Sequence, residues 1–368
     1  MASPDISQPA PATPLARGYR PWLDGVRAVA VLMVVAQHVL GHIPVDLGFV
    51  GVGLFFALSG YLITSLLLDE RSACGSVSLR SFYLRRGARL FPALLLVVLV
   101  CNALFLLQGD YGPLTGSLTA LTYTANYAQI LKPDLVPGYG PTWTLAVEEH
   151  FYVVWPLVLL WVTDRYGLRT ALKATLAVCV AAFLWRAALA LIHAPYSLVG
   201  IGSLERADAL LYGCAAAIAV RLGWRPRTWV TLAGVVTIAV LPIAFRHETY
   251  DALVVGNVVL AVAGAAVVVG LDYAAPAWLR GALSLRPLVV VGLLSYGIYL
   301  WHGPLMRIAA EAGFSGRWWR VVVAVVAIAF AALSFRYLEA PVRAWARRRS
   351  PAPARVVAPE TAARGAIP

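Results

Sequence analysis

The chain has 368 residues, of which 60% are hydrophobic and only 13% are charged. Soluble domains carry roughly 25% charged residues, so this composition predicts a multi-span helical membrane protein. The formal net charge of +12 suits a nucleic-acid binder, but the placement of the basic residues argues against one. The cysteines, Cys74, Cys101, Cys179 and Cys214, show neither zinc-site spacing nor the pattern of a disulfide framework, and no metal site is expected.

Ten apolar stretches are long enough to cross a bilayer core of about 30 Å. They cover residues 24–41, 48–68, 90–107, 141–163, 170–193, 206–222, 228–245, 252–271, 287–310 and 317–338. The first lacks a small-residue cleavage signal and is interpreted as a retained span. The stretch 114–131 is too polar to face lipid, so it is predicted to be a re-entrant or interfacial helix. The expected fold is all-α, with about ten transmembrane helices plus this additional helix.

The basic residues predict the orientation of the chain. With a cytoplasmic N-terminus, most Lys and Arg side chains fall in inside loops, as the positive-inside rule requires. The outside loops then hold only Lys132, Arg206, Arg246, Arg307, Arg317 and Arg320. Both termini are therefore predicted to be cytoplasmic, in a multi-pass protein of the cell membrane. Residues 1–20 and 345–368 are rich in Pro, Ala and Arg and are expected to be disordered tails around a membrane domain over 21–344.

Ionisable side chains within apolar spans are costly and mark functional candidates. Arg27 and His38 are separated by ten residues of the first span, so they share one helix face about 16 Å apart. Counting along their spans places Glu148 and His302 near the depth of His38, in the outer half of the membrane. The three segments are therefore expected to converge around His38.

Structural alternatives exist for several of these groups. His302 is equally consistent with a hydrogen bond between helices, and Glu148 with an ion pair to the buried Arg186. Asp208 follows Arg206 closely enough to form a structural pair with it.

Arg86 and Arg89 lie in the segment between the second and third spans, where they are expected to be neighbours on one helix face at the membrane surface. Guanidinium groups match phosphate oxygens, which indicates a phosphate clamp. A topology signal with lipid-headgroup contacts explains the same pair equally well.

Other residues are expected to be mainly structural. Ser59 and Gly60 are small residues in the second span, a pattern typical of close helix packing. Trp143 fits an interfacial aromatic belt or packing role. Glu149 and His150 point to other helix faces than Glu148 and are expected to be peripheral.

Taken together, these segments resemble the acyltransferase-3 family of integral membrane acyltransferases, from Arg20 to Arg343. RPWLDGVRAVAVLMVVAQH is similar to the opening motif of that family, an Arg and a His separated by ten residues, and assigns it to Arg27 and His38. The other matching segments, in chain order, are GFVGVGLFFALSGYLIT, FYLRRGARLFPAL with Arg86 and Arg89, PTWTLAVEEHFYVVWPL with Trp143, Thr144 and Glu148, RADALLYG, LSYGIYLWHGPL and SFRYLEAPVR.

The resemblance implies transfer of an acyl group, usually acetyl, from a coenzyme A thioester to a hydroxyl of a sugar, glycan or natural product. A macrolide-like compound and a cell-envelope glycan are both candidate acceptors. Some members carry an additional periplasmic hydrolase-like domain, and the short segment after the last span leads us to expect a stand-alone form. His150 stands where Gln is common and Gly303 where an aromatic is frequent, which bears on the acceptor.

The hypothesis assigns three sets of residues. The expected catalytic residues are His38, Glu148 and Arg27; the acyl-CoA-binding residues are Arg86, Arg89, Arg27 and Arg336; the substrate-binding residues are Ser59, Trp143, Tyr299, His302 and Asp208. His38 is the expected general base, oriented by Glu148, and a covalent acyl-His intermediate is equally compatible. Apart from donor and acceptor, the expected partner is the lipid bilayer. The competing hypothesis is a transporter or flippase for a glycan or lipid-linked sugar, because intramembrane Arg, Glu and His also serve transport paths.

Overall fold

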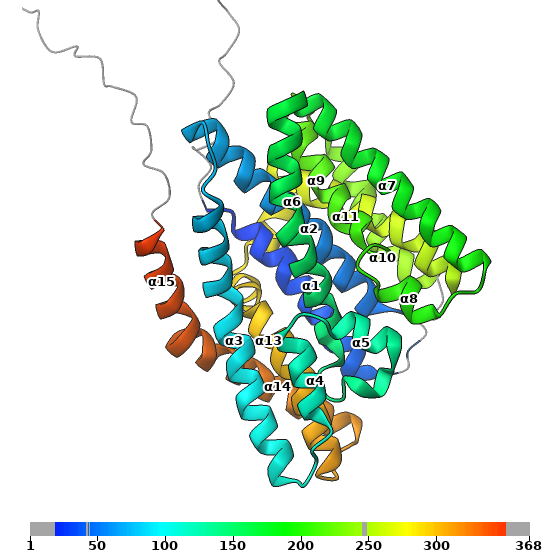
Figure 1. Cartoon of the computed structure of the whole chain (residues 1–368), viewed down its shortest axis with the longest axis vertical. Coiled ribbons are helices and arrows are strands. Elements are labelled where there is room, and N and C mark those ends of the chain that lie inside the picture. The colour runs from blue at the N-terminus through cyan, green and yellow to red at the C-terminus, as the bar shows by residue number, and fades with distance from the viewer. Residues whose placement is uncertain (1–18, 42, 44, 245–248, 351–368) are drawn as a thin grey trace, which may run out of the picture.

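The computed structural model describes residues 19–41, 43, 45–244 and 249–350 (Figure 1). Every regular element within these ranges is helical, which confirms the all-α prediction. The longer helices are α1 (Pro21–Leu40), α2 (Leu47–Cys74), α3 (Leu79–Leu107), α6 (Trp143–Tyr166), α7 (Leu168–Leu191), α9 (Ala207–Arg221), α10 (Thr228–Ala244), α11 (Asn257–Tyr273), α13 (Arg286–Glu311) and α14 (Arg317–Ser334). The shorter ones are α4 (Pro113–Leu121), α5 (Ala125–Leu131), α8 (Tyr196–Ile201), α12 (Ala277–Leu283) and α15 (Ala340–Arg349).

Four one-turn or transitional elements connect or extend these helices within the described ranges. Two lie between α5 and α6, namely η2 (Pro133–Leu135) and η3 (Gly140–Thr142), and two are π turns, η4 (Ala252–Gly256) before α11 and η5 (Phe335–Glu339) after α14. With these extensions, eight of the described helices are long and apolar enough to cross a membrane. All ten predicted stretches are helical, but two form shorter helices: α9 has 15 residues and α10 has 17. The chain is a multi-pass membrane protein.

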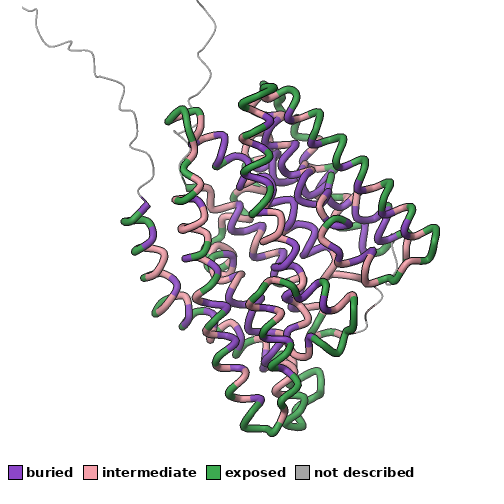
Figure 2. The backbone as a smooth tube through the Cα atoms, in the orientation of Figure 1, coloured by how far each residue is buried: buried purple, intermediate pink, exposed green. Residues whose placement is uncertain are grey.

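The helices form a bundle with α2 and α11 inside it and α7 and α14 at its periphery (Figures 1 and 2). The peripheral helices expose Val, Leu and Trp side chains such as Val178, Leu184 and Val325. In water such apolar surface would be unfavourable, whereas in a bilayer it faces lipid tails. The polar side chains that remain inside are therefore the ones that need an explanation.

Small residues let the central helices approach closely. Gly60 of α2 lies against the backbone of α9, and a methyl group there would overlap the carbonyl oxygen of Leu210. Gly213 of α9 makes the reciprocal approach to the backbone of α2 at Ala57. The predicted packing role is therefore confirmed for Gly60, while the neighbouring Ser59 points to a different helix. Gly292 of α13 similarly contacts the backbone of α1.

Three segments differ from the sequence-based expectation. The span predicted over 90–107 begins earlier, because α3 starts at Leu79 with Ser78 as its N-cap, so Arg86 and Arg89 share a helix as expected but lie well inside it. The stretch 114–131 forms two short helices, α4 and α5, instead of one. Residues 345–349 continue α15 and are not a tail, because Ala346 is buried against the bundle. The rest of the predicted tails, 1–18 and 351–368, lies outside the described residues.

Candidate functional site

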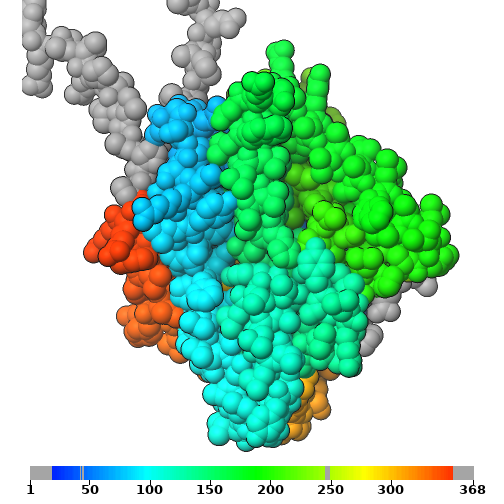
Figure 3. Space-filling view, viewed as in Figure 1, coloured from blue at the N-terminus to red at the C-terminus, as the bar shows by residue number. Residues whose placement is uncertain are grey.

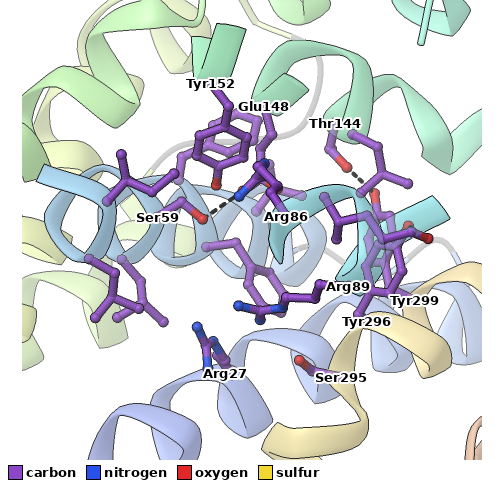
Figure 4. A pocket seen from close by; sticks show the side chains of 18 residues that line it. Arg27, Ser59, Arg86, Arg89, Thr144, Glu148, Tyr152, Ser295, Tyr296 and Tyr299 are labelled. Carbon is purple, nitrogen blue, oxygen red and sulfur yellow. Dashed lines mark hydrogen bonds between the residues drawn. The ribbon is translucent and has the colours of Figure 1, made fainter. Parts of the chain in front are cut away.

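A cavity of about 120 Å³ opens where α1, α2, α3, α6 and α13 meet (Figure 4). Helices from both ends of the chain contribute to it, so the cavity exists only in the folded bundle. Its polar lining includes Arg27, Ser59, Arg86, Arg89, Glu148 and Tyr299. A cavity of this volume holds several water molecules, so a phosphate-sized group fits in it.

Two of the three guanidinium groups in the cavity have carboxylate partners. Arg27 donates to Asp24 one turn earlier on α1, at 2.7 Å. Arg86 donates through Nε and Nη2 to Glu149, at 3.0 and 2.7 Å, and its Cζ lies 3.0 Å from the ring centre of Tyr152. Glu149 was expected to be peripheral; that expectation was wrong, because α3 passes on the side of α6 that Glu149 faces.

Arg89 differs from its two neighbours. Among the described residues, no carboxylate lies within ion-pair distance of its guanidinium, and its buried Nε has no hydrogen-bond partner. Figure 4 shows Arg89 and Arg27 reaching into the same space from α3 and α1. Like charges repel, so an anion bound between the two guanidinium groups would stabilise this arrangement. The residue type and the geometry both favour phosphate.

Glu148 is held by a serine and not by an arginine or a histidine. The Ser59 hydroxyl donates to Glu148 Oε1 at 2.8 Å (Figure 4). The suggested pairing of Glu148 with Arg186 is therefore absent, and so is a contact between Glu148 and His38 that would orient the imidazole. Because the Ser59 hydrogen points to the carboxylate, this hydroxyl presents only lone pairs to a ligand.

Tyr299 forms the wall of the cavity on the side of α13. Its hydroxyl donates to the carbonyl of Pro141 at 2.6 Å and accepts from Thr144 Oγ1 at 2.7 Å. These bonds join α13 to the start of α6 and fix the ring in place. The backbone carbonyl of Tyr299 accepts a hydrogen bond from Nδ1 of His302 at 2.6 Å.

His302 and His38 lie together beyond Tyr299. Their ring centres are 4.9 Å apart, and His302 is fully buried whereas His38 is exposed. His38 Nδ1 donates to the Val34 carbonyl at 2.8 Å. A carbonyl can only accept, so Nδ1 carries a proton in both rings, and in the neutral form of either ring Nε2 has a lone pair. The buried Nε2 of His302 has no hydrogen-bond partner among the described residues.

Besides the two histidines, three predicted site residues lie outside the lining of the cavity. Asp208 accepts from both Nη atoms of Arg186, at 2.9 and 2.8 Å, in a fully buried ion pair. Its expected partner Arg206 instead donates to Asn257, so the predicted pairing was wrong. Trp143 packs edge-on against Phe56 outside the cavity lining.

Arg336 is the third of these residues. Its side chain is exposed and its guanidinium lies 5.6 Å from the ring of Tyr337, outside the cavity lining. The π turn η5 changes the direction of the side chains in this segment, which a count of residues along an α-helix does not anticipate.

Several residues of the site were not anticipated. Tyr152, Ser295 and Tyr296 line the cavity, and Asp24 and Glu149 neutralise its arginines. Asp24 lies three residues before Arg27, a helical ion-pair spacing that the sequence already showed. His150 bonds to Ser203 at 2.8 Å. Within the described residues, no cluster of His, Cys, Asp and Glu side chains is arranged to hold a metal ion.

Comparisons with known proteins give the same assignment as the motifs. A family model described as an acyltransferase domain matches residues 20–337. Peptidoglycan O-acetyltransferase OatA of Listeria monocytogenes serovar 1/2a is 32% identical over 364 residues, which cover 90% of this chain and 57% of that protein. O-acetyltransferase OatA of Staphylococcus aureus strain NCTC 8325 is 28% identical over 366 residues, covering 88% of this chain and 57% of that protein.

The chain thus spans little more than half the length of these relatives. No solved structure matches it significantly. Six of the seven motif segments fall within the matched region, and the last, SFRYLEAPVR, begins in it and extends past its end. The match gives no support to a transporter. The chain belongs to the acyltransferase-3 family of integral membrane acyltransferases.

Proposed function

We propose that the protein transfers an acetyl group from acetyl-CoA to a hydroxyl of a cell-envelope glycan. The main supporting observation is a cavity with three arginines, one of which has no carboxylate partner among the described residues. A single residue, Tyr299, separates this cavity from a histidine pair. An anionic carrier and a base for a hydroxyl are the two requirements of acyl transfer from a CoA thioester.

The donor would bind with its diphosphate among Arg27, Arg86 and Arg89. Charge-assisted hydrogen bonds from guanidinium groups to phosphate oxygens are among the strong ones in proteins. His38 lies on the same helix as Arg27, and about 16 Å of α1 separates them. A pantetheine arm extended along α1 and past Tyr299 would bring the thioester to the histidine pair.

His38 would act as the general base. Its Nε2 accepts the proton of the acceptor hydroxyl while the oxygen attacks the thioester carbonyl. The C–S bond then breaks, and the proton passes from His38 to the departing thiolate, so that an ester and free CoA result. Because Nδ1 of His38 is held by the Val34 carbonyl, Nε2 is available without a change of tautomer.

His302 and Glu148 would have separate roles. The unpartnered Nε2 of His302 can accept a hydrogen bond from an acceptor hydroxyl, which makes this residue a substrate-binding group. Glu148 holds Ser59 and places a negative charge beside the arginines, which limits their mutual repulsion when the donor is absent. It would therefore act on the donor site and not on His38.

The acceptor would reach the histidine pair from the side of the membrane opposite to the donor. His38 is exposed near the C-terminal end of α1, whereas Arg27 lies near its N-terminal end. With both termini cytoplasmic, the exposed ring faces outward, towards the cell envelope. The name of the Listeria relative refers to peptidoglycan, which favours a glycan over a macrolide-like acceptor.

The direct test measures CoA release by protein purified in lipid nanodiscs. With acetyl-CoA and soluble peptidoglycan fragments, we expect free thiol to accumulate together with an O-acetylated product seen by mass spectrometry. Little thiol should form without acceptor. No product with any glycan, from protein that remains folded, would refute the proposal, and transport of the glycan across vesicles without acetylation would support the transporter hypothesis.

A further inference from the structure

A second group of basic residues lies beside the cavity, along the seam between α3 and α15. The last long helix is interrupted by the π turn η5, directly ahead of Pro341. Proline lacks an amide hydrogen and crowds the carbonyl four residues earlier, and π turns are frequent at functional sites. After this turn α15 runs along the flank of α3 (Figures 1 and 3).

The two helices run antiparallel with basic residues at their contacts. Arg85 of α3 lies 3.5 Å from the carbonyl of Ser350 at the end of α15. Arg343 comes seven residues before Ser350 and Arg89 comes four residues after Arg85, so the antiparallel packing brings these two arginines to neighbouring levels of the seam. The basic groups of the cavity are therefore continued by Arg343 along the outside of α3.

Arg343 is held in place from one side only. Its Nη2 donates to the buried Glu339 at 2.5 Å, and its Cζ lies 5.0 Å from the ring of Phe335. Ser334 donates to the other carboxylate oxygen of Glu339 at 3.2 Å. Within the part of the chain that the structure describes, the buried Nε of Arg343 has no hydrogen-bond partner, as is also true of Arg89. Both arginines thus retain unused donors on neighbouring helices.

We propose that Arg343 binds the ribose 3′-phosphate of the CoA donor while Arg86 and Arg89 bind its diphosphate. This inference rests on the proposed function. The diphosphate would occupy the arginines of the cavity, so the ribose 3′-phosphate would need a further cation, and no other Lys or Arg of the described residues lines the cavity. The seam that leads away from Arg89 provides the next guanidinium at Arg343. The π turn directs Arg343 inward and leaves Arg336, the residue expected from the sequence, exposed.

The test removes the same contact from the protein and from the ligand. Acetyl-CoA and acetyl-3′-dephospho-CoA are compared as donors for the wild type and for the double variant Glu339→Gln with Arg343→Gln. The double variant replaces a buried ion pair by two amides, which avoids leaving the Glu339 carboxylate buried without a partner. Glu339→Gln alone and Arg336→Gln serve as controls that keep the Arg343 guanidinium.

In the wild type we expect the KM for the dephospho donor to be about tenfold higher, the cost of one charged contact. The double variant should show a similar rise for acetyl-CoA and no further rise for the dephospho donor. Both controls should retain the discrimination between the two donors. A second variant, Arg343→Lys, keeps the ion pair and should retain part of the discrimination if the double variant proves unstable.

Three results would overturn the inference. In the first, the double variant still distinguishes the two donors as the wild type does. In the second, the double variant raises both KM values by the same factor. In the third, the donor KM is unchanged while thermal stability loses its dependence on phosphatidylglycerol, which assigns Arg343 to a lipid phosphate. A wild type that binds neither donor would instead refute the proposed function itself.

Discussion

The rings of His38 and His302 meet edge to face at 4.9 Å, although they belong to the first long helix and to α13. Each ring donates its Nδ1 hydrogen to a carbonyl of its own helix, so the two bases are oriented by backbone geometry and not by a carboxylate. In this respect the pair differs from hydrolase triads, in which an acidic side chain fixes the tautomer. The exposed His38 can meet a substrate directly, and the buried His302 can support it.

Replacing His38 by Ala should reduce turnover about 10²-fold or more, the usual contribution of a general base. The measurement is CoA release at saturating donor and acceptor. His193→Ala is the matched control, because this exposed histidine packs against Tyr250 outside the cavity and its replacement should leave turnover nearly unchanged. Turnover of the His38 variant within a few fold of the wild type would remove His38 from the chemistry.

Replacing Arg89 by Ala should raise the KM for acetyl-CoA about tenfold to a hundredfold with a smaller change in kcat. Hydrogen bonds to charged groups contribute about 1.5–3 kcal/mol, and those of Arg89 are not already used by a carboxylate. The exposed Arg80 lies on the same helix, so Arg80→Ala serves as the control. An equal rise in KM for both variants would indicate general electrostatic attraction in place of a binding site.

Replacing Asp208 by Ala should destabilise the protein by about 3–5 kcal/mol, because Arg186 would be left buried without its partner. The measurement is the thermal unfolding midpoint in nanodiscs. Substituting both Arg186 and Asp208 by leucine should recover much of the loss. If Asp208→Ala keeps its unfolding midpoint but loses affinity for acceptor, the substrate-binding role expected from the sequence is correct after all.

Replacing Gly60 by Ala should separate α2 from α9 and destabilise the fold by about 1–3 kcal/mol, the typical effect of overpacking. The added methyl group would overlap the Leu210 carbonyl oxygen, which belongs to backbone and cannot rotate away. Gly87→Ala is the control, since the space around Gly87 is open. Similar midpoints for the two variants would contradict the close approach of α2 and α9.

Much of the site was predictable from the sequence. Charged residues such as Arg27 and Glu148 stand out in apolar helices, because burying an ionisable group in hydrocarbon is costly without a function or a partner. The spacing of the motifs identified the family, and counting at 1.5 Å per residue placed His38 and His302 at a common depth, where the structure also has them in contact. The depth of a residue along a straight helix depends only on the number of residues between it and the helix end.

Which side chains pair with one another depended on the tertiary structure. A residue count gives the height of a side chain, but the helix that it faces depends on how all helices pack and on local turns such as η5. Glu148 therefore bonds to Ser59 and not to His38, Asp208 pairs with Arg186, and Arg343 lies inward where Arg336 was expected. The sequence by itself determined which polar groups enter the membrane and how deep they lie. Helix packing decided which of these groups come into contact, because contact depends on how each helix is rotated about its own axis.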